Sequence, residues 1–388
     1  MTTIALSGLV SAGVAAGTWL NGSDPHRAVT DLPGAAGWPA AVRAGAPGVA
    51  APDLDALTPA RARRFFAGLS PAARTALARR APGVVGNLDG APLRLRYAAN
   101  ERTARADGAV TASPGPSRGR LLAYDPRGDG KIAEVFGDLA TARQIVVIIP
   151  GCGWTLSKIL ASGRPDPATA AVNAAGKVAD KVAGNAPGKV AGDVAGAANP
   201  IAGARALLAE IRGREPAAQV AVVVWLGYDA PESIDQQAAR SERAVTGARA
   251  LTRFLAGLPG DGPVTLASHS YGSIVAGRAA RHNPRVTDVV ALASPGMDTG
   301  SVSGLRTRAR VWAARAPGDP IAFAPNVRIW RYGHGVDPVD PGFGALVFRT
   351  GSARGHGGYY LPGTESLRNL ARIALGRTRE VTLVAHAR

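Results

Sequence analysis

The chain has 388 residues, of which 46% are hydrophobic and 19% are charged, and this composition is typical of a globular protein with a substantial core. It contains one cysteine, which excludes an intrachain disulfide and a zinc or iron–sulfur site built from cysteines. The formal net charge is +17. Because the basic residues are mostly scattered arginines and only 5% of the residues are aromatic, we expect no specific binding of nucleic acid.

The first twenty residues carry no charge. They resemble the apolar part of a secretory signal, but they lack its basic N-terminal region, and glycines interrupt the apolar run. Too few of them are strongly apolar for a membrane-spanning helix. We therefore favour a cytoplasmic location, and a secreted or envelope-associated protein is the alternative.

The next segment is rich in proline, glycine and alanine and contains one helical pattern, between Thr58 and Arg80. Within it, Ser70-Pro71 has the order of a helix cap followed by a first-turn proline. We predict an N-terminal appendage over residues 1–83 that packs on a main domain over residues 84–388. A separate helical module that binds a partner is the alternative.

The main domain has a pattern of strands separated by helices. Leu93, Leu95 and Tyr97 alternate with arginines, which predicts a half-buried strand. Further strands are predicted at 120–124 and 131–136, as an antiparallel hairpin, and at 144–149, 220–225, 264–266, 288–293, 310–314 and 346–349; helices are predicted at 236–255, after residue 272 and at 364–375. This alternation indicates an α/β fold in which helices cover both faces of a mostly parallel sheet.

Residues 155–203 differ from their surroundings, because they are rich in alanine, glycine and valine, contain four prolines and repeat the tetrapeptide Gly-Lys-Val-Ala. Such low complexity predicts an insertion. A lid over a pocket and a segment without fixed structure are the two interpretations.

The stretch from Val264 to Gly277 carries the clearest chemical signal. A short apolar strand enters a turn of small residues, and a helix rich in alanine and glycine follows. The turn fits the nucleophile elbow Gly-x-Ser-x-Gly, with Ser270 as the nucleophile and Ser268 in place of the first glycine. The alternative is a serine in an ordinary loop between a strand and a helix.

A serine hydroxyl needs a base and an acid to become a strong nucleophile, and in an elbow protein the acid and the histidine follow the serine. Functional residues of parallel sheets lie where strands end. Asp319 directly follows the predicted strand 310–314, and Asp298 follows the preceding strand. We favour Asp319 as the acid, with Asp298 as the second candidate and a turn-capping role as the alternative for either.

The base is chosen from six histidines. His356 follows the last predicted strand, where a loop can carry its ring over the elbow, whereas His334 precedes that strand. We favour His356 over His334. His269 adjoins Ser270, and strand geometry turns its side chain away from the serine hydroxyl. The remaining histidines lie away from strand ends or in the tail: His26, His282 and His386.

The oxyanion that forms on attack needs preorganised N–H donors. One donor is expected from the backbone of Tyr271, the residue after the nucleophile, and another from the glycine-rich loop after strand 144–149, at Cys152 or Gly153. Cys152 therefore contributes its backbone, because chain order provides no histidine for its thiol.

These motifs resemble the α/β-hydrolase superfamily and, within it, an uncharacterised actinobacterial family marked by Gly-His-Ser-Tyr-Gly-Ser and Trp-Leu-Gly-Tyr-Asp-Ala-Pro. The resemblance extends from about Val84 to the C-terminus. It implies that Ser270, Asp319 and His356 form the catalytic triad. The matching segments are Trp225-Leu226-Gly227-Tyr228-Asp229-Ala230-Pro231, Ser268-His269-Ser270-Tyr271-Gly272-Ser273, Ser294-Pro295-Gly296, Gly86-Asn87-Leu88-Asp89-Gly90, Tyr97-Ala98-Ala99-Asn100 and Gly355-His356-Gly357-Gly358-Tyr359.

The sequence thus predicts a serine hydrolase that cleaves a carboxylic ester of a small molecule or lipid through an acyl-enzyme, without a metal or organic cofactor. A non-catalytic module that binds a partner or the cell envelope is the alternative from another class. A thioesterase or an amidase with the same triad is a further alternative.

Overall fold

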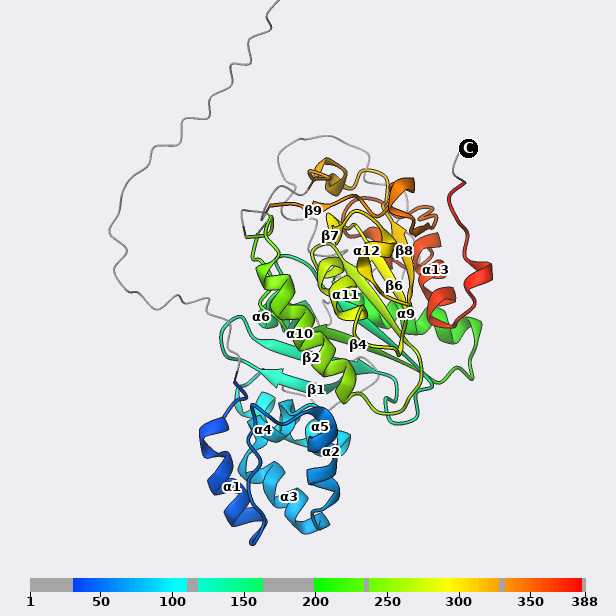
Figure 1. Ribbon diagram of the computed structural model, residues 1–388. Helices are drawn as coiled ribbons and strands as arrows, with labels where there is room; N and C mark the ends of the chain where they lie inside the picture. Colours follow the sequence, from blue (N-terminus) through cyan, green and yellow to red (C-terminus); the bar gives the residue numbers. More distant parts are fainter. Residues whose placement is uncertain (1–30, 110–117, 163–198, 234–236, 328–331, 386–388) are drawn as a thin grey trace, which may run out of the picture.

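The computed structural model describes residues 31–109, 118–162, 199–233, 237–327 and 332–385 (Figure 1). Residues 1–20 and most of the predicted insertion at 155–203 lie outside the described residues, so the predictions of an export signal and of a lid stay untested. The described ends of this stretch are helical: α6 (Leu156–Ser162) lies within it, and α9 (Pro200–Arg214) begins within it. No helix in the described part of the chain is long and apolar enough to cross a membrane.

An eight-stranded sheet forms the centre of the molecule, in the order β1-β2-β4-β3-β5-β6-β8-β10. Only β1 and β2 run antiparallel to their neighbours, and all other pairings are parallel. The strands are β1 (Arg120–Asp125), β2 (Lys131–Phe136), β3 (Gln144–Ile149), β4 (Val220–Leu226), β5 (Val264–His269), β6 (Val286–Leu292), β8 (Arg310–Ala314) and β10 (Leu346–Val347). This arrangement confirms the predicted hairpin and the mostly parallel sheet.

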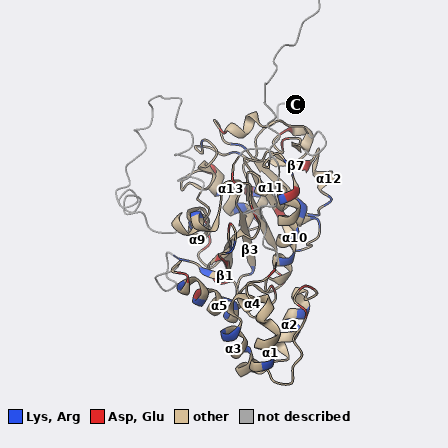
Figure 2. Cartoon of the chain, turned by 90° about the vertical axis from the view of Figure 1, so that its left-hand side faces the viewer, with Lys and Arg blue, Asp and Glu red and all other residues tan. Residues whose placement is uncertain are grey.

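The central strands form because their sequences are nearly unbroken runs of β-branched and other apolar residues. All seven residues of β4 are buried, as are all six of β5. Such runs are typical of parallel strands that have helices on both sides. The helices α9 and α13 (Glu365–Ala374) pack together on one face, and α10 (Glu242–Gly257) and α11 (Gly272–Ala280) pack together on the other (Figure 2).

The N-terminal part is helical and packs beneath the edge strand β1 (Figure 1). Its side chains form a hydrophobic cluster of their own, from Trp38 to Ala91. The helices are α1 (Trp38–Gly45), α2 (Pro59–Ala67), α3 (Pro71–Arg80), α4 (Pro82–Asn87) and α5 (Leu93–Ala106). Ser70 caps α3 as expected, because its hydroxyl accepts a hydrogen bond from the amide of Ala73.

The strand predicted at residues 93–97 is wrong, because these residues begin the helix α5. Alternation over five residues did not reveal that the arginine at position 96 is buried. The side chain of Arg96 lies 3.2 Å from the carboxylate of Asp89 and donates to the carbonyl of Gly86, so it belongs to the inner face of a helix. The predicted boundary between residues 83 and 84 falls inside α4, and the helical part extends to Ala106.

Asn87 joins the helical part to the sheet. Its amide nitrogen donates to the carbonyl of Tyr124 at 2.8 Å, and its amide oxygen accepts from the backbone N–H of Tyr124 at 2.9 Å. Asn100 adds a hydrogen bond of 3.2 Å to the carbonyl of Leu121. These two asparagines therefore satisfy backbone groups of the edge strand β1 that no further strand pairs with.

We predict that Asn87→Ala lowers the free energy of unfolding by about 1–3 kcal/mol, because it leaves both backbone groups of Tyr124 without their partner. Urea denaturation measures this change. Arg102→Ala, at an exposed position of α5, is the control and should change the value by no more than about 0.5 kcal/mol. Equal stability of the two variants would contradict the role of Asn87.

Candidate active site

Ser270 lies at a sharp turn between β5 and α11. It has φ of 52°, and it is one of four non-glycine residues with positive φ among those that the structure describes. This conformation is strained, so surrounding contacts must hold it. The amide of Ser270 donates to Leu292 at 2.9 Å, and its carbonyl accepts from the hydroxyl of Ser273 at 2.7 Å. The strand, strained turn and helix are the geometry of a nucleophile elbow.

The elbow tolerates serine at position 268, where the motif has glycine. The hydroxyl of Ser268 donates to the carbonyl of Val290 on β6 at 2.7 Å, and the residue is fully buried. Gly272 cannot be replaced in the same way, because a Cβ atom there would lie 2.5 Å from the carbonyl oxygen of Ile149. The close approach of β3 to the elbow therefore requires the second glycine of the motif.

Asp319 and His356 meet at the same edge of the sheet. Nδ1 of His356 lies 2.7 Å from Oδ1 of Asp319. Because a carboxylate only accepts, Nδ1 of His356 carries a proton and donates it to Asp319. Burial tends to raise the pKa of Asp319, but the hydrogen bond and charge of His356, with the hydroxyl of Tyr359, outweigh burial and lower it. The predicted acid and base are thus brought together.

Tyr359 is a member of this cluster that sequence reasoning missed. Its hydroxyl donates to Oδ2 of Asp319 at 2.5 Å and accepts from the amide of Ala316 at 2.8 Å. Burial, followed by the charge of Asp319, raises the pKa of Tyr359, so the phenol stays protonated and can donate. The signal in the sequence was its place three residues after His356, in the segment that carries the resemblance.

His356 lies beside the elbow. Its ring centroid is 4.6 Å from that of His269, the residue that precedes Ser270. Among the hydrogen bonds between described residues, none joins Oγ of Ser270 to Nε2 of His356. In unliganded enzymes this bond is often long and forms when substrate binds. The role of Ser270, Asp319 and His356 as a triad therefore stays a prediction.

The alternative pair, Asp298 and His334, forms a second cluster. Nδ1 of His334 lies 3.1 Å from Asp298, and Nε2 lies 2.7 Å from the carbonyl of Ala238. Asp298 also accepts from the hydroxyl of Ser241 at 2.6 Å and from Arg278 at 2.7 Å. Since both ring nitrogens of His334 face acceptors, this histidine has no lone pair directed at a nucleophile. The pair joins the short strands β7 (Gly296–Thr299) and β9 (His334–Gly335) to the segment before α10.

The loop after β3 lies directly against the elbow. A Cβ atom on Gly151 would lie 2.7 Å from Cβ of Ser270 and 2.9 Å from the backbone nitrogen of Tyr271. The amide of Gly153 donates to the carbonyl of Pro231 at 2.7 Å. Of the two predicted donors in this loop, Gly153 thus has its N–H committed to the carbonyl of Pro231.

The segment after β4 supports that loop. The hydroxyl of Tyr228 donates to the carbonyl of Pro150 at 2.7 Å, and the Tyr228 ring stacks on Trp225 with centroids 6.0 Å apart. Asp229 forms an ion pair with Arg243 at 2.6 Å. The septapeptide at residues 225–231 therefore holds the glycine-rich loop beside the nucleophile, a role that its sequence did not reveal.

Residues 164–329 match a family model described as alpha/beta hydrolase. This range contains the strand, turn and helix around Ser270 and the loop that carries Asp319. The chain has an α/β-hydrolase fold. This fold accounts for the parallel sheet, its helical layers and the elbow at the carboxyl end of β5.

Two relatives of the chain are uncharacterized mycobacterial proteins. One, from Mycobacterium tuberculosis (strain ATCC 25618 / H37Rv), is 29% identical over 296 residues, which cover 67% of this chain and 40% of the relative. The other, from Mycobacterium bovis, is 37% identical over 91 residues, which cover 22% of this chain and 34% of the relative. The chain thus spans 40% of the length of the first of these relatives.

Solved structures with a similar arrangement include a serine hydrolase without a lid from Xanthomonas campestris and a serine hydrolase homologue from Coxiella burnetii. The first is 16% identical, covers 71% of this chain and 100% of its own, and has a TM-score of 0.35. The second is 10% identical, covers 69% of this chain and 99% of its own, and has a TM-score of 0.31.

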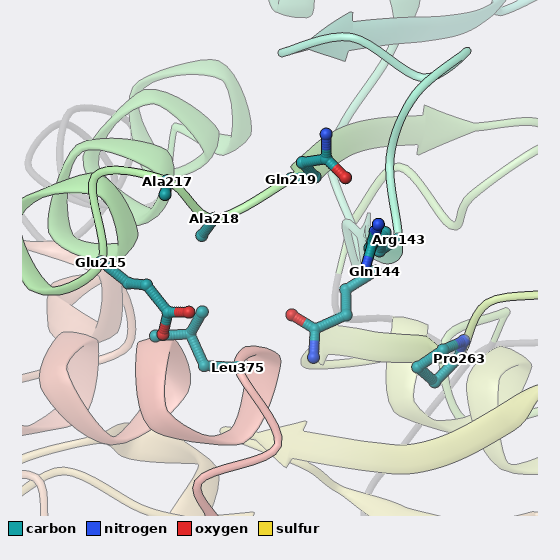
Figure 3. A pocket seen from close by; sticks show the side chains of 8 residues that line it. All are labelled: Arg143, Gln144, Glu215, Ala217, Ala218, Gln219, Pro263 and Leu375. Carbon is teal, nitrogen blue, oxygen red and sulfur yellow. The ribbon is translucent and has the colours of Figure 1, made fainter.

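A cavity of about 510 Å³ lies at the opposite edge of the hydrolase sheet, where β3, β4 and β5 begin (Figure 3). Its lining is Arg143, Gln144, Glu215, Ala217, Ala218, Gln219, Pro263 and Leu375. It is therefore separate from Ser270, which lies at the carboxyl end of β5.

Across the described ranges, no group of three or more His, Cys, Asp or Glu side chains could hold a metal ion.

We predict that the Asp298 cluster stabilises the protein in a pH-dependent way. Burial would raise the pKa of Asp298, but the hydrogen bonds from His334 and Ser241 and the charge of Arg278 outweigh burial and hold it at about 2. A depressed pKa adds stability above the unfolded value of about 4, and that stability is lost as pH falls toward 2.

The measurement is urea unfolding of the wild type and of Asp298→Asn between pH 6 and pH 2. We expect the wild type to be more stable near neutral pH, and its advantage to shrink by on the order of 2 kcal/mol across this range. An advantage that is independent of pH would contradict the depressed pKa.

Proposed function

We propose that the protein is a serine hydrolase that cleaves a carboxylic ester through an acyl-enzyme. The observation that carries the proposal is the strained Ser270, with φ of 52°, whose neighbour His269 contacts the ring of a histidine that is hydrogen-bonded to a buried carboxylate. A serine in the left-handed conformation costs folding free energy. The turn at Ser270 nevertheless keeps this conformation. Strain of this kind supports a nucleophilic role for Ser270.

In this proposal the hydroxyl of Ser270 attacks the ester carbonyl, and its proton moves to Nε2 of His356. Asp319 holds the tautomer with the proton on Nδ1 and stabilises the imidazolium that forms. The imidazolium then gives its proton to the departing alkoxide, which leaves as an alcohol. A water molecule repeats the sequence on the acyl-enzyme, releases the carboxylic acid and regenerates Ser270.

The negative charge of the tetrahedral intermediate needs donors that are already in place. We assign one donor to the backbone N–H of Tyr271, at the start of α11, where the helix dipole also favours negative charge. We assign the second donor to the backbone N–H of Cys152. It belongs to the loop that lies close to the elbow because Gly151 has no Cβ atom. The side chain of Tyr271 points away from this site. Its hydroxyl donates to the backbone carbonyl of Arg240 at 2.7 Å and accepts from the amide of Ala244 at 3.1 Å.

The loop after β8 supports an apolar acyl group in the substrate. Phe323, four residues after Asp319, is 89% exposed, and Val327 is 52% exposed. Exposed apolar side chains on one loop can provide contact surface for an apolar ligand. A small-molecule or lipid ester fits this loop better than a strongly polar one, and esters of graded chain length measure the preference.

We predict that a fluorophosphonate probe labels the wild type and does not label Ser270→Ala. His356→Gln should lower the labelling rate by about 10³-fold or more, because the serine loses its base. His334→Gln, in the other Asp–His pair, should change the rate far less. The exposed His282→Gln is the control with unchanged labelling. A well-folded wild type that the probe does not label would favour a non-catalytic binding module.

Gly151→Ala provides an independent test of the oxyanion loop. The added Cβ atom would meet Ser270, the carbonyl of His269 at 2.8 Å and the backbone nitrogen of Tyr271, so the loop must move away from the elbow. We expect kcat to fall by about 10²-fold or more, as when one oxyanion donor is lost. Gly260→Ala, in the turn after α10, is the matched control for the loss of a glycine, because its Cβ would meet no atom within 4 Å although its φ of 65° adds strain. Equal kcat values for the two variants would contradict the role of the loop.

A further inference from the structure

His269 occupies the last position of β5 and is buried. The mechanism proposed above gives it no step, although it precedes Ser270 in the chain. Its Nε2 lies 2.6 Å from the backbone carbonyl oxygen of His356. Because a carbonyl only accepts, Nε2 carries the proton and donates. The residue before the nucleophile is thus hydrogen-bonded to the backbone of the base.

The rings of the two histidines also touch. Their centroids are 4.6 Å apart with an interplanar angle of 63°, and the ring of Tyr359 lies 5.9 Å from His269 on the same side of the cluster. His356 is therefore held at three places: Asp319 fixes its Nδ1, and His269 contacts both its ring and its carbonyl. The Asp319 contact fixes the ring's orientation, whereas the contacts of His269 fix how far the residue lies from the elbow.

The charge state of His269 suits this task. Burial, followed by the charge of His356, lowers the pKa of His269 to about 4. His269 is therefore neutral near pH 7 and adds no positive charge beside a base that must itself become positive during the reaction. A neutral donor can hold the loop without making protonation of His356 less favourable.

We propose that His269 is a positioning residue that sets the distance between Ser270 and the ring of His356, by hydrogen-bonding the end of β5 to the loop at residues 351–357. The proposal rests on the hydrolase function proposed above. It assigns this histidine a role in the geometry of the reaction, since a shift of about 1 Å in a catalytic group can cost about 10²-fold in rate.

The test compares two replacements of similar size. The amide nitrogen of His269→Gln can reach the position of Nε2 and donate, whereas His269→Leu fills the space without a donor. We expect His269→Leu to lower kcat for a p-nitrophenyl ester by about 10- to 100-fold with KM within about threefold. His269→Gln should restore most of the loss, and the exposed His282→Gln should match the wild type. Wild-type kcat in His269→Leu, or equally low kcat in both His269 variants, would overturn the proposal.

A second measurement does not depend on catalysis. The proton on Nδ1 of His356 should give a low-field NMR signal through its short hydrogen bond to Asp319. We expect this signal to persist in His269→Gln and to broaden or move in His269→Leu, while ¹⁵N spectra of the wild type show His269 with its proton on Nε2 near pH 7. A proton on Nδ1 of His269, or an unchanged His356 signal in His269→Leu, would overturn the proposal even if the protein hydrolyses no ester. If the fluorophosphonate probe does not label Ser270, the expected NMR signals of His356 and His269 still support the positioning role of His269.

Discussion

The close approach of two backbone segments organises this molecule. The end of β3 passes so near the elbow that neither Gly151 nor Gly272 has room for a Cβ atom. The approach places the glycine-rich loop, the strained serine and the first turn of α11 within contact of one another. Because main chain meets main chain there, the geometry does not depend on flexible side chains, and amide donors can be held ready for a developing negative charge.

Hydrogen bonds from neighbouring residues hold these two backbone segments in place. Tyr228 holds the carbonyl of Pro150, and the carbonyl of Pro231 holds the amide of Gly153. On the other side, the hydroxyl of Tyr271 bridges Arg240 and the amide of Ala244, which ties the start of α10 to the elbow. The segment around residues 225–231 therefore acts on the site through support, and not through contact with a reacting atom.

Two Asp–His pairs of similar chemistry lie at the same edge of the sheet, but their surroundings differ. The pair of His334 is closed, since an acceptor faces each ring nitrogen. In the pair of His356, the carboxylate of Asp319 accepts from Nδ1, and no hydrogen bond between described residues involves Nε2. Hydrogen-bond partners, rather than residue type, thus separate a structural histidine from a candidate base.

The sequence by itself determined the sheet, the elbow and the candidates for acid and base. Buried parallel strands are apolar along their whole length, and a strained turn needs small residues at set positions, so both leave a local pattern. The pattern was misleading at residues 93–97. Arginines alternate there with apolar residues as in a half-buried strand, but Arg96 is buried and pairs with Asp89 on the inner face of a helix. Only the tertiary structure showed that both ring nitrogens of His334 face acceptors, and that Tyr359 and His269 contact the Asp319–His356 pair. Those distinctions depend on hydrogen bonds between loops that are far apart in the chain, as between His269 and His356, and no local pattern of residues records such partners.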